Sequence, residues 1–89
     1  MHAVLVNVRF DPARYDEAMQ GLRENVVPGA KGAPGFVKGI WFGDTESGNA
    51  VVVFESEAQA QQMAAMVTSD PGDPVQVEEV RVFEVHAEA

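Results

Sequence analysis

Hydrophobic and polar residues follow two different periods along this chain. They alternate over residues 2–10, 36–42, 50–55 and 75–86, and they follow a helical period over residues 12–27 and 57–68. Alternation is typical of half-buried strands, whereas apolar spacings of three and four are typical of amphipathic helices. The pattern therefore predicts the element order β-α-β-β-α-β.

This order is that of the ferredoxin-like, or split βαβ, plan. It predicts an α+β fold with a four-stranded antiparallel sheet, formed by residues 1–89 as a single domain. A chain of this length buries only about 60–65% of the surface that it exposes when unfolded. Because the helices cover one face of the sheet, we expect the other face to be covered by a second copy.

Local signals set the expected helix ends. Asp11 followed by Pro12 is a favourable helix start, and Ser56 with Gln59 forms a capping-box pattern before the second helix. Pro28 is expected to end the first helix at the residue before it. Residues 28–35 contain three glycines and two prolines, and we interpret them as a connecting loop.

Two further signals concern the strands. Residues 44–49 are rich in turn-forming types and predict a hairpin between the second and third strands. In the last strand the apolar set changes phase between Val77 and Val80, with Glu78 and Glu79 between them. One extra residue produces such a shift, so the sequence predicts a β-bulge near Glu78–Glu79.

Charge and composition narrow the possible functions. Six basic residues stand against 14 acidic ones, a formal net charge of -8, and cysteine is absent. A chain this acidic lacks the basic surface that nucleic acids and anionic membranes require. The absence of a signal-peptide pattern and of a long apolar run predicts a cytoplasmic protein. No metal-binding motif is present, and the two histidines, His2 and His86, are interpreted as surface residues near the ends of the chain.

Two segments carry a resemblance to a known family. Residues 34–39 read Pro-Gly-Phe-Val-Lys-Gly before the expected hairpin, and residues 54–58 read Phe-Glu-Ser-Glu-Ala where the third strand meets the second helix. Together with the element order, they resemble the antibiotic-biosynthesis-monooxygenase type of dimeric α/β barrel. The resemblance implies a homodimer in which two sheets face each other. In this chain Leu5, Phe83, Val85 and Trp41 or its strand neighbours would supply apolar residues to that face.

The same resemblance implies a pocket between the helices and the sheet. Family members include cofactor-independent oxygenases that act on quinol-like molecules, heme-degrading enzymes and related isomerases. By this resemblance Asn7 and Trp41 are candidate catalytic residues, and Arg9, Tyr15 and Met63 are candidate substrate-binding residues. The heme-degrading members use a histidine after the second helix, and this chain has none between residues 3 and 85. We therefore expect no cofactor.

The candidate residues also have purely structural interpretations. Asn7 is either a pocket amide or a structural amide that is satisfied or edge-facing, and Trp41 either forms a pocket wall or only packs. Two functions follow. The first is a cofactor-independent oxygenase for a small hydrophobic or quinol-like molecule, which requires a pocket that contains Asn7. The second is a non-catalytic dimeric module that binds a small molecule or serves as a partner subunit. It is favoured if Met19, Met63 and Met66 fill the space.

Overall fold

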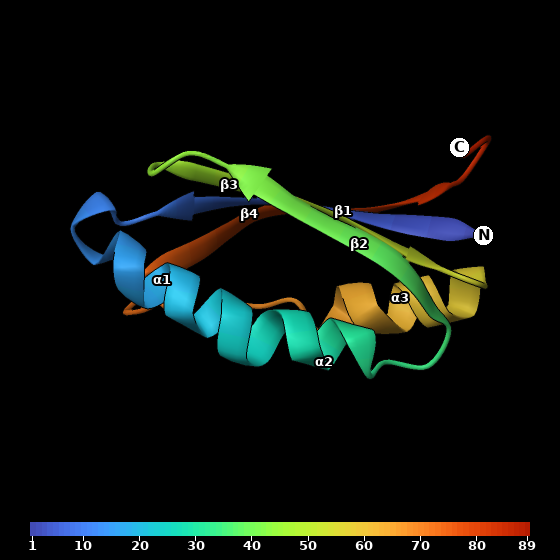
Figure 1. The fold of residues 1–89 in the computed structure, drawn as a ribbon, viewed down its shortest axis with the longest axis horizontal. Helices are drawn as coiled ribbons and strands as arrows, with labels where there is room; N and C mark the ends of the chain where they lie inside the picture. Colours follow the sequence, from blue (N-terminus) through green and yellow to red (C-terminus); the bar gives the residue numbers. More distant parts are fainter.

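The computed structural model describes residues 1–89 as a four-stranded antiparallel sheet with helices on one face (Figure 1). The strands lie in the order β2-β3-β1-β4. Their bounds are β1 His2–Phe10, β2 Phe36–Gly43, β3 Ser47–Phe54 and β4 Val75–Glu84, and the helices are α1 Tyr15–Gly21, α2 Val27–Lys31 and α3 Glu57–Met66. The first and last strands are antiparallel neighbours. The predicted ferredoxin-like α+β fold is confirmed.

The first helical arm is longer than predicted. It begins with a 3₁₀ turn, Pro12–Arg14, capped by the Asp11 side chain, and passes from α1 through a π-helical turn, Leu22–Val26, into α2. The prediction that the helix ends before Pro28 is wrong, and residues 28–31 are helical rather than loop. Proline has no N–H for the bond to the residue four positions earlier. A π-helical turn precedes Pro28, and in it the Val27 N–H donates to the Leu22 carbonyl, five residues earlier. Pro28 then lies in the first turn of α2, where no N–H is required, so the helical arm continues through it.

The other boundaries differ from the predictions by a few residues. The Ser56 hydroxyl accepts a hydrogen bond from the Gln59 N–H at 3.2 Å, as the capping pattern predicts. The helix α3 ends at Met66 instead of residue 68, because Val67 is already extended. The strand β3 starts at Ser47 instead of residue 50, since the Asp44 carboxylate closes a tight hairpin turn. The strand β4 ends at residue 84 instead of 86.

The predicted bulge is present in β4. Asn7 pairs with Glu79, whereas the next residue, Val8, pairs with Val77, so Glu78 is the extra residue. The bulge restores the phase of the apolar residues on both sides of it. The shift in sequence period was therefore a reliable signal of a backbone irregularity.

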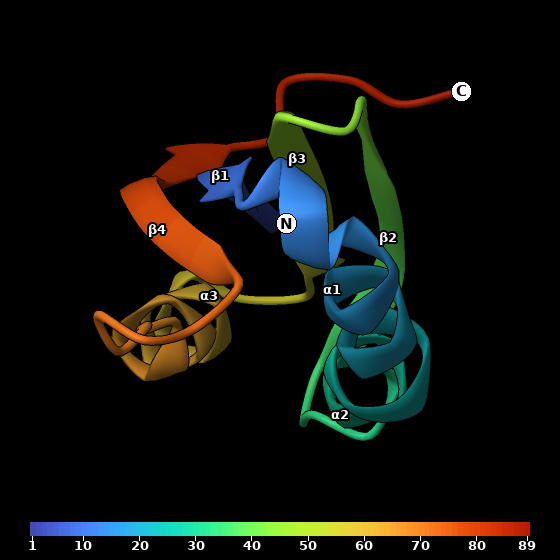
Figure 2. The ribbon, with the colours of Figure 1, turned by 90° about the vertical axis from the view of Figure 1, so that its left-hand side faces the viewer.

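The helices cover one face of the sheet, which we call the inner face. Viewed end-on, α3 lies beneath one side of the sheet and the α1–α2 arm beneath the other (Figure 2). The buried core joins this face to α3 and consists of Val4, Val6, Ala50, Val52, Phe54 and Ala60. No helix of the chain has the length and apolar character of a membrane span.

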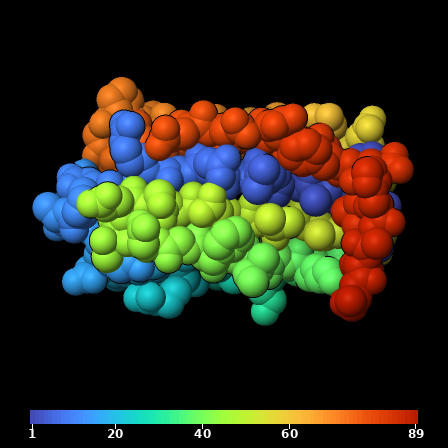
Figure 3. All heavy atoms as spheres, turned by 90° about the horizontal axis from the view of Figure 1, so that it is seen from above, coloured from blue at the N-terminus to red at the C-terminus, as the bar shows by residue number.

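No helix crosses the opposite, outer face (Figure 3). Three large apolar side chains are exposed there: Ile40 at 60%, Phe42 at 52% and Phe83 at 40%. At one end of this face the C-terminal segment 85–89 crosses the strands, and Glu88 meets Lys38 on β2 at 3.0 Å. The outer face is thus a largely open surface that carries apolar side chains.

Candidate functional site

A cavity of about 630 Å³ lies between the inner face and the two helical layers. Its volume falls within the range of about 300–1,000 Å³ that is usual for small-molecule sites. Eighteen of its 24 lining residues are hydrophobic, so its interior favours an apolar occupant. The space between helices and sheet is therefore open, even though Met19, Met63 and Met66 all line it.

Two aromatic rings line the sheet side of the cavity, and the far end of each ring lies close to a glycine. A Cβ added to Gly39 would lie 2.8 Å from Cη2 of Trp41, and a Cβ added to Gly48 would lie 2.5 Å from Cζ of Phe10. The Phe10 ring also packs edge-on against Tyr15, with centroids 5.7 Å apart. Trp41 and Phe10 thus form the sheet side of the cavity.

The walls come from the two helical layers. The α1–α2 arm contributes Met19 and Leu22, and α3 contributes Met63. Val26 and Met66 also line the cavity while remaining 51% and 71% exposed, so they form part of its rim. Methionine is unbranched and adapts its shape readily. This wall can therefore adjust to occupants of different outline.

Few polar side chains reach the cavity. Tyr15, Asn25 and Asn49 are lining residues, and the only lining carboxylate is Asp44 in the hairpin turn. The Asn49 side chain is itself paired with Asn7.

Hydrogen bonds from the backbone N–H groups of Ser47 and Glu46 lower the pKa of Asp44 below its ordinary value. Its Oδ1 accepts these bonds and one from the Ser47 hydroxyl, so one carboxylate oxygen is engaged in the turn. No histidine, lysine, arginine or glutamate lines the cavity, so Asp44 and Tyr15 are its only ionisable lining residues.

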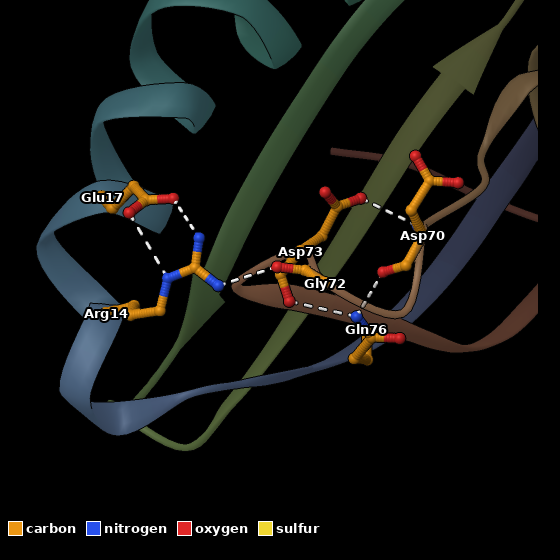
Figure 4. A network of polar contacts seen from close by, with 6 residues as sticks. All are labelled: Arg14, Glu17, Asp70, Gly72, Asp73 and Gln76. Atoms are coloured by element: carbon orange, nitrogen blue, oxygen red, sulfur yellow. Dashed lines mark hydrogen bonds and ion pairs between the residues drawn. The ribbon is translucent and has the colours of Figure 1, made fainter.

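A polar network ties the start of the first helical arm to the loop before β4 (Figure 4). Arg14, next to Tyr15, donates to the Gly72 carbonyl at 2.8 Å and to the Glu17 carboxylate at 2.6 Å. The hydrogen bond to Glu17 raises the pKa of Arg14 above its ordinary value. Gln76 in turn donates to the carbonyls of Asp70 and Asp73. The loop before β4 is therefore fastened to the start of the first arm.

The structure brings together three of the five candidate residues. Trp41, Tyr15 and Met63 all line the cavity. Asn7 and Arg9 lie on the outer face, because alternate residues of β1 point to opposite sides of the sheet. The pocket expected to contain Asn7 is therefore not the one that forms. The roles assigned to all five residues remain predictions.

The Asn7 side chain is paired on the outer face. Its Nδ2 donates to Oδ1 of Asn49, its partner across β1 and β3, at 2.5 Å. Asn7 thus acts as a structural amide, because it provides the hydrogen bond that the Asn49 side-chain oxygen accepts on the neighbouring strand. Arg9 is exposed on the same face.

Sequence reasoning missed Asn25 and Phe10 as lining residues. Asn25 reaches the cavity from the π-helical turn, and such turns often occur at functional sites. No local sequence pattern marked this turn, because Pro28 equally indicates a helix that stops. Phe10 was assigned to the inner face, but nothing in the sequence indicated that Gly48 would make room for its ring.

The donor set of the cavity does not fit a heme bound through histidine. No histidine or cysteine lines it, and no basic side chain is available there to pair with heme carboxylates. His2 lies elsewhere and was expected at the surface, but its side chain is only 19% exposed and its Nε2 lies 3.3 Å from Glu57 on α3. No group of three or more histidine, cysteine or acidic residues is placed to hold a metal ion.

Comparisons with known proteins show similarity in structure. No family model and no curated protein sequence matches the chain. The heme degrader MhuD from Mycobacterium tuberculosis, solved with two hemes bound in its active site, superposes with a TM-score of 0.68 at 16% identity, over 98% of both chains. A variant of SnoaB, a cofactor-independent oxygenase from Streptomyces nogalater, superposes with a TM-score of 0.63 at 16% identity, over 98% of this chain and 95% of that one.

At 16% identity these similarities establish the fold and leave the activity open. Both alignments extend over nearly the whole chain, so the likeness includes the sheet, both helical layers and their order. The chain therefore has the ferredoxin-like fold of these two proteins, as its resemblance to the antibiotic-biosynthesis-monooxygenase type implies.

Proposed function

We propose that the chain binds a small apolar aromatic molecule in the inner-face cavity and oxidises it with dioxygen without a cofactor. The observation that carries this proposal is the cavity itself, which is open, about 630 Å³ in volume and lined by Trp41, Tyr15 and Met63. Its shape and apolar lining suit a flat, quinol-like ring system. The fold that it shares with a cofactor-independent oxygenase supports the assignment.

The chemistry draws its electrons from the substrate. A ring CH₂ group of a quinol-like molecule becomes a carbonyl, one oxygen atom enters the product, and the second leaves as water with the two hydrogens. The cavity contributes binding and the exclusion of water, and the Tyr15 hydroxyl and the Asn25 amide are the groups available to orient substrate oxygens. The substrate's first proton is released to solvent through the mouth.

We also propose that the protein is a homodimer joined through the outer face. Exposed apolar side chains of two strands, Ile40 and Phe42 on β2 and Phe83 on β4, support this assembly. Contiguous apolar surface on a small domain usually marks an interface. Arg9 would then lie in the interface and not at the site of the reaction, which changes the substrate-binding role expected for it.

The non-catalytic alternative rests on a separate observation. No histidine, lysine, arginine or glutamate lines the cavity, and Asn7, the expected catalytic amide, faces the other way. A protein that only binds or carries an aromatic molecule needs nothing more than the apolar cavity. Dimerisation and ligand binding are common to both functions, and turnover separates them.

Oxygen uptake with anthrone, a three-ring ketone with one reactive CH₂ group, tests the proposal. We expect the protein to accelerate the consumption of one O₂ per anthrone and to yield anthraquinone. The Ala50→Leu variant, which places a larger side chain on the cavity lining, should slow the reaction, whereas Ala58→Leu on the exposed side of α3 should not. Binding without acceleration would support the non-catalytic module, and absence of binding would refute both functions.

A further inference from the structure

Gly39 and Gly48 occupy inner-face positions of the sheet where a side chain would collide with an aromatic ring. The nearest atoms to a Cβ at Gly39 belong to the Trp41 ring, at 2.8 and 2.9 Å. The nearest atoms to a Cβ at Gly48 belong to the Phe10 ring, at 2.5 and 2.8 Å. At both positions the obstructing atoms are the far end of a side chain, so the ring and not the backbone would have to move.

A displaced ring must move away from the glycine against which it packs. The cavity is open space next to both rings, because Trp41 and Phe10 are both lining residues. Ordinary van der Waals contact begins at 3.4 Å, so a Cβ would lift each ring by roughly half an ångström or more. A lifted ring takes its volume from the cavity.

The two glycines act on different parts of the sheet side of the cavity. Gly39 pairs with Val52 on β3, and Gly48 lies four residues before that partner on the same strand. At about 3.3 Å per residue this places them roughly 13 Å apart along the strand. A one- or two-ring molecule can occupy the space beside one lifted ring, whereas a longer molecule must lie over both.

We propose that Gly39 and Gly48 are specificity-determining residues, which keep the Trp41 and Phe10 rings against the sheet and so set the length of aromatic molecule that the cavity accepts. The inference rests on the proposed small-molecule function of this cavity. It adds two positions that act through the rings packed against them; of the two, only Gly48 itself lines the cavity. A difference as small as one methylene in an apolar pocket changes discrimination by about 10- to 200-fold.

The test compares two probes that each carry one hydroxyl group, 1-naphthol with two rings and 2-hydroxyanthracene with three. Their dissociation constants are measured by calorimetry on the wild-type protein and on Gly39→Ala and Gly48→Ala. We expect each variant to lose about tenfold or more in affinity for the three-ring probe while its affinity for the two-ring probe changes less than about threefold. Gly21→Ala is the control, because a Cβ there meets nothing within 4 Å.

A compensating variant separates a lifted ring from general damage. Gly39→Ala combined with Trp41→Leu removes the ring that the new methyl group displaces, so affinity for the three-ring probe should recover. Equal losses for both probes, or no loss for the longer one, would overturn the inference. If one glycine variant does not fold, the other tests the same claim at its own ring. A wild-type protein that binds neither probe would refute the proposed function and this inference with it, whereas binding without discrimination would refute the inference alone.

Discussion

The replacement Asn7→Leu tests whether Asn7 is a structural amide or a functional one. In the structure Asn7 donates to Asn49 across β1 and β3 on the outer face and does not line the cavity. Leucine removes the donor and leaves the Asn49 carbonyl oxygen without its partner. We therefore expect a loss of stability with no change in the binding of 1-naphthol.

The expected loss follows from the environment of the pair. The hydrogen bond is part-buried, and a typical intramolecular hydrogen bond contributes about 1 kcal/mol net. A fully buried orphaned acceptor would cost about 1–3 kcal/mol, so a partly exposed one should lie near the lower end. For a domain of this size, 1 kcal/mol corresponds to a change in Tm of about 4–8 °C. Replacing Asn49 with leucine as well removes the orphaned group, and the double variant should regain most of the loss.

Thermal melts at one protein concentration, with and without 1-naphthol, provide the measurement. Asn25→Leu is the matched control, because Asn25 lines the cavity from the other side. That control should alter the response to the ligand more than the stability. If Asn7→Leu keeps its Tm and loses the ligand response while Asn25→Leu does not, Asn7 belongs to the site and the placement argued here is wrong.

Three further predictions concern the turn, the outer face and heme. Hydrogen bonds in the turn lower the pKa of Asp44, so its stabilising effect is complete above the ordinary value of 3.8 and is lost as the pH falls through the lower, folded-state value. The Tm difference between wild type and Asp44→Ala should therefore be constant above about pH 5 and shrink well below pH 3.8. A difference that grows in acid would contradict this prediction. In sedimentation at micromolar concentration, Ile40→Glu on the outer face should convert the dimer to a monomer. The control Gln61→Glu on α3 should leave the dimer intact. A monomeric wild-type protein would exclude the dimeric barrel. Titration with hemin should give no Soret shift that depends on a histidine, and a shift abolished by His86→Ala would refute that prediction.

The order of strands and helices could be predicted because each element carries a repeated signal. The alternation of Val4, Val6 and Val8 on β1 identifies the inner face, and the broken alternation at Glu78 locates the bulge. The end of the first helix was mispredicted because the rule for Pro28 assumes an α-helical ladder before it. A π-helical turn changes that ladder, and no local pattern distinguishes it from a helix that stops.

The site was predicted less completely, because cavity lining depends on which way each side chain faces. Asn7, Trp41 and Tyr15 were all named by the family resemblance; Trp41 and Tyr15 line the cavity, whereas Asn7 lies on the other face. The pattern of β1 already placed Asn7 opposite the apolar set, so the direction was available from the sequence. The pairing with Asn49 depends on the register between β1 and β3, which the sequence does not specify. The homodimer and the cytoplasmic location remain predictions.

The central claim is that the inner-face cavity binds a small aromatic molecule. The most direct test follows the methyl NMR signals of the labelled protein during titration with 1-naphthol. Saturable shifts should appear at Val6 and Met63, which line the cavity, and signals of Leu5 and Val51 on the outer face should stay in place. Shifts confined to the outer face, or no saturable shift at either set, would contradict the account.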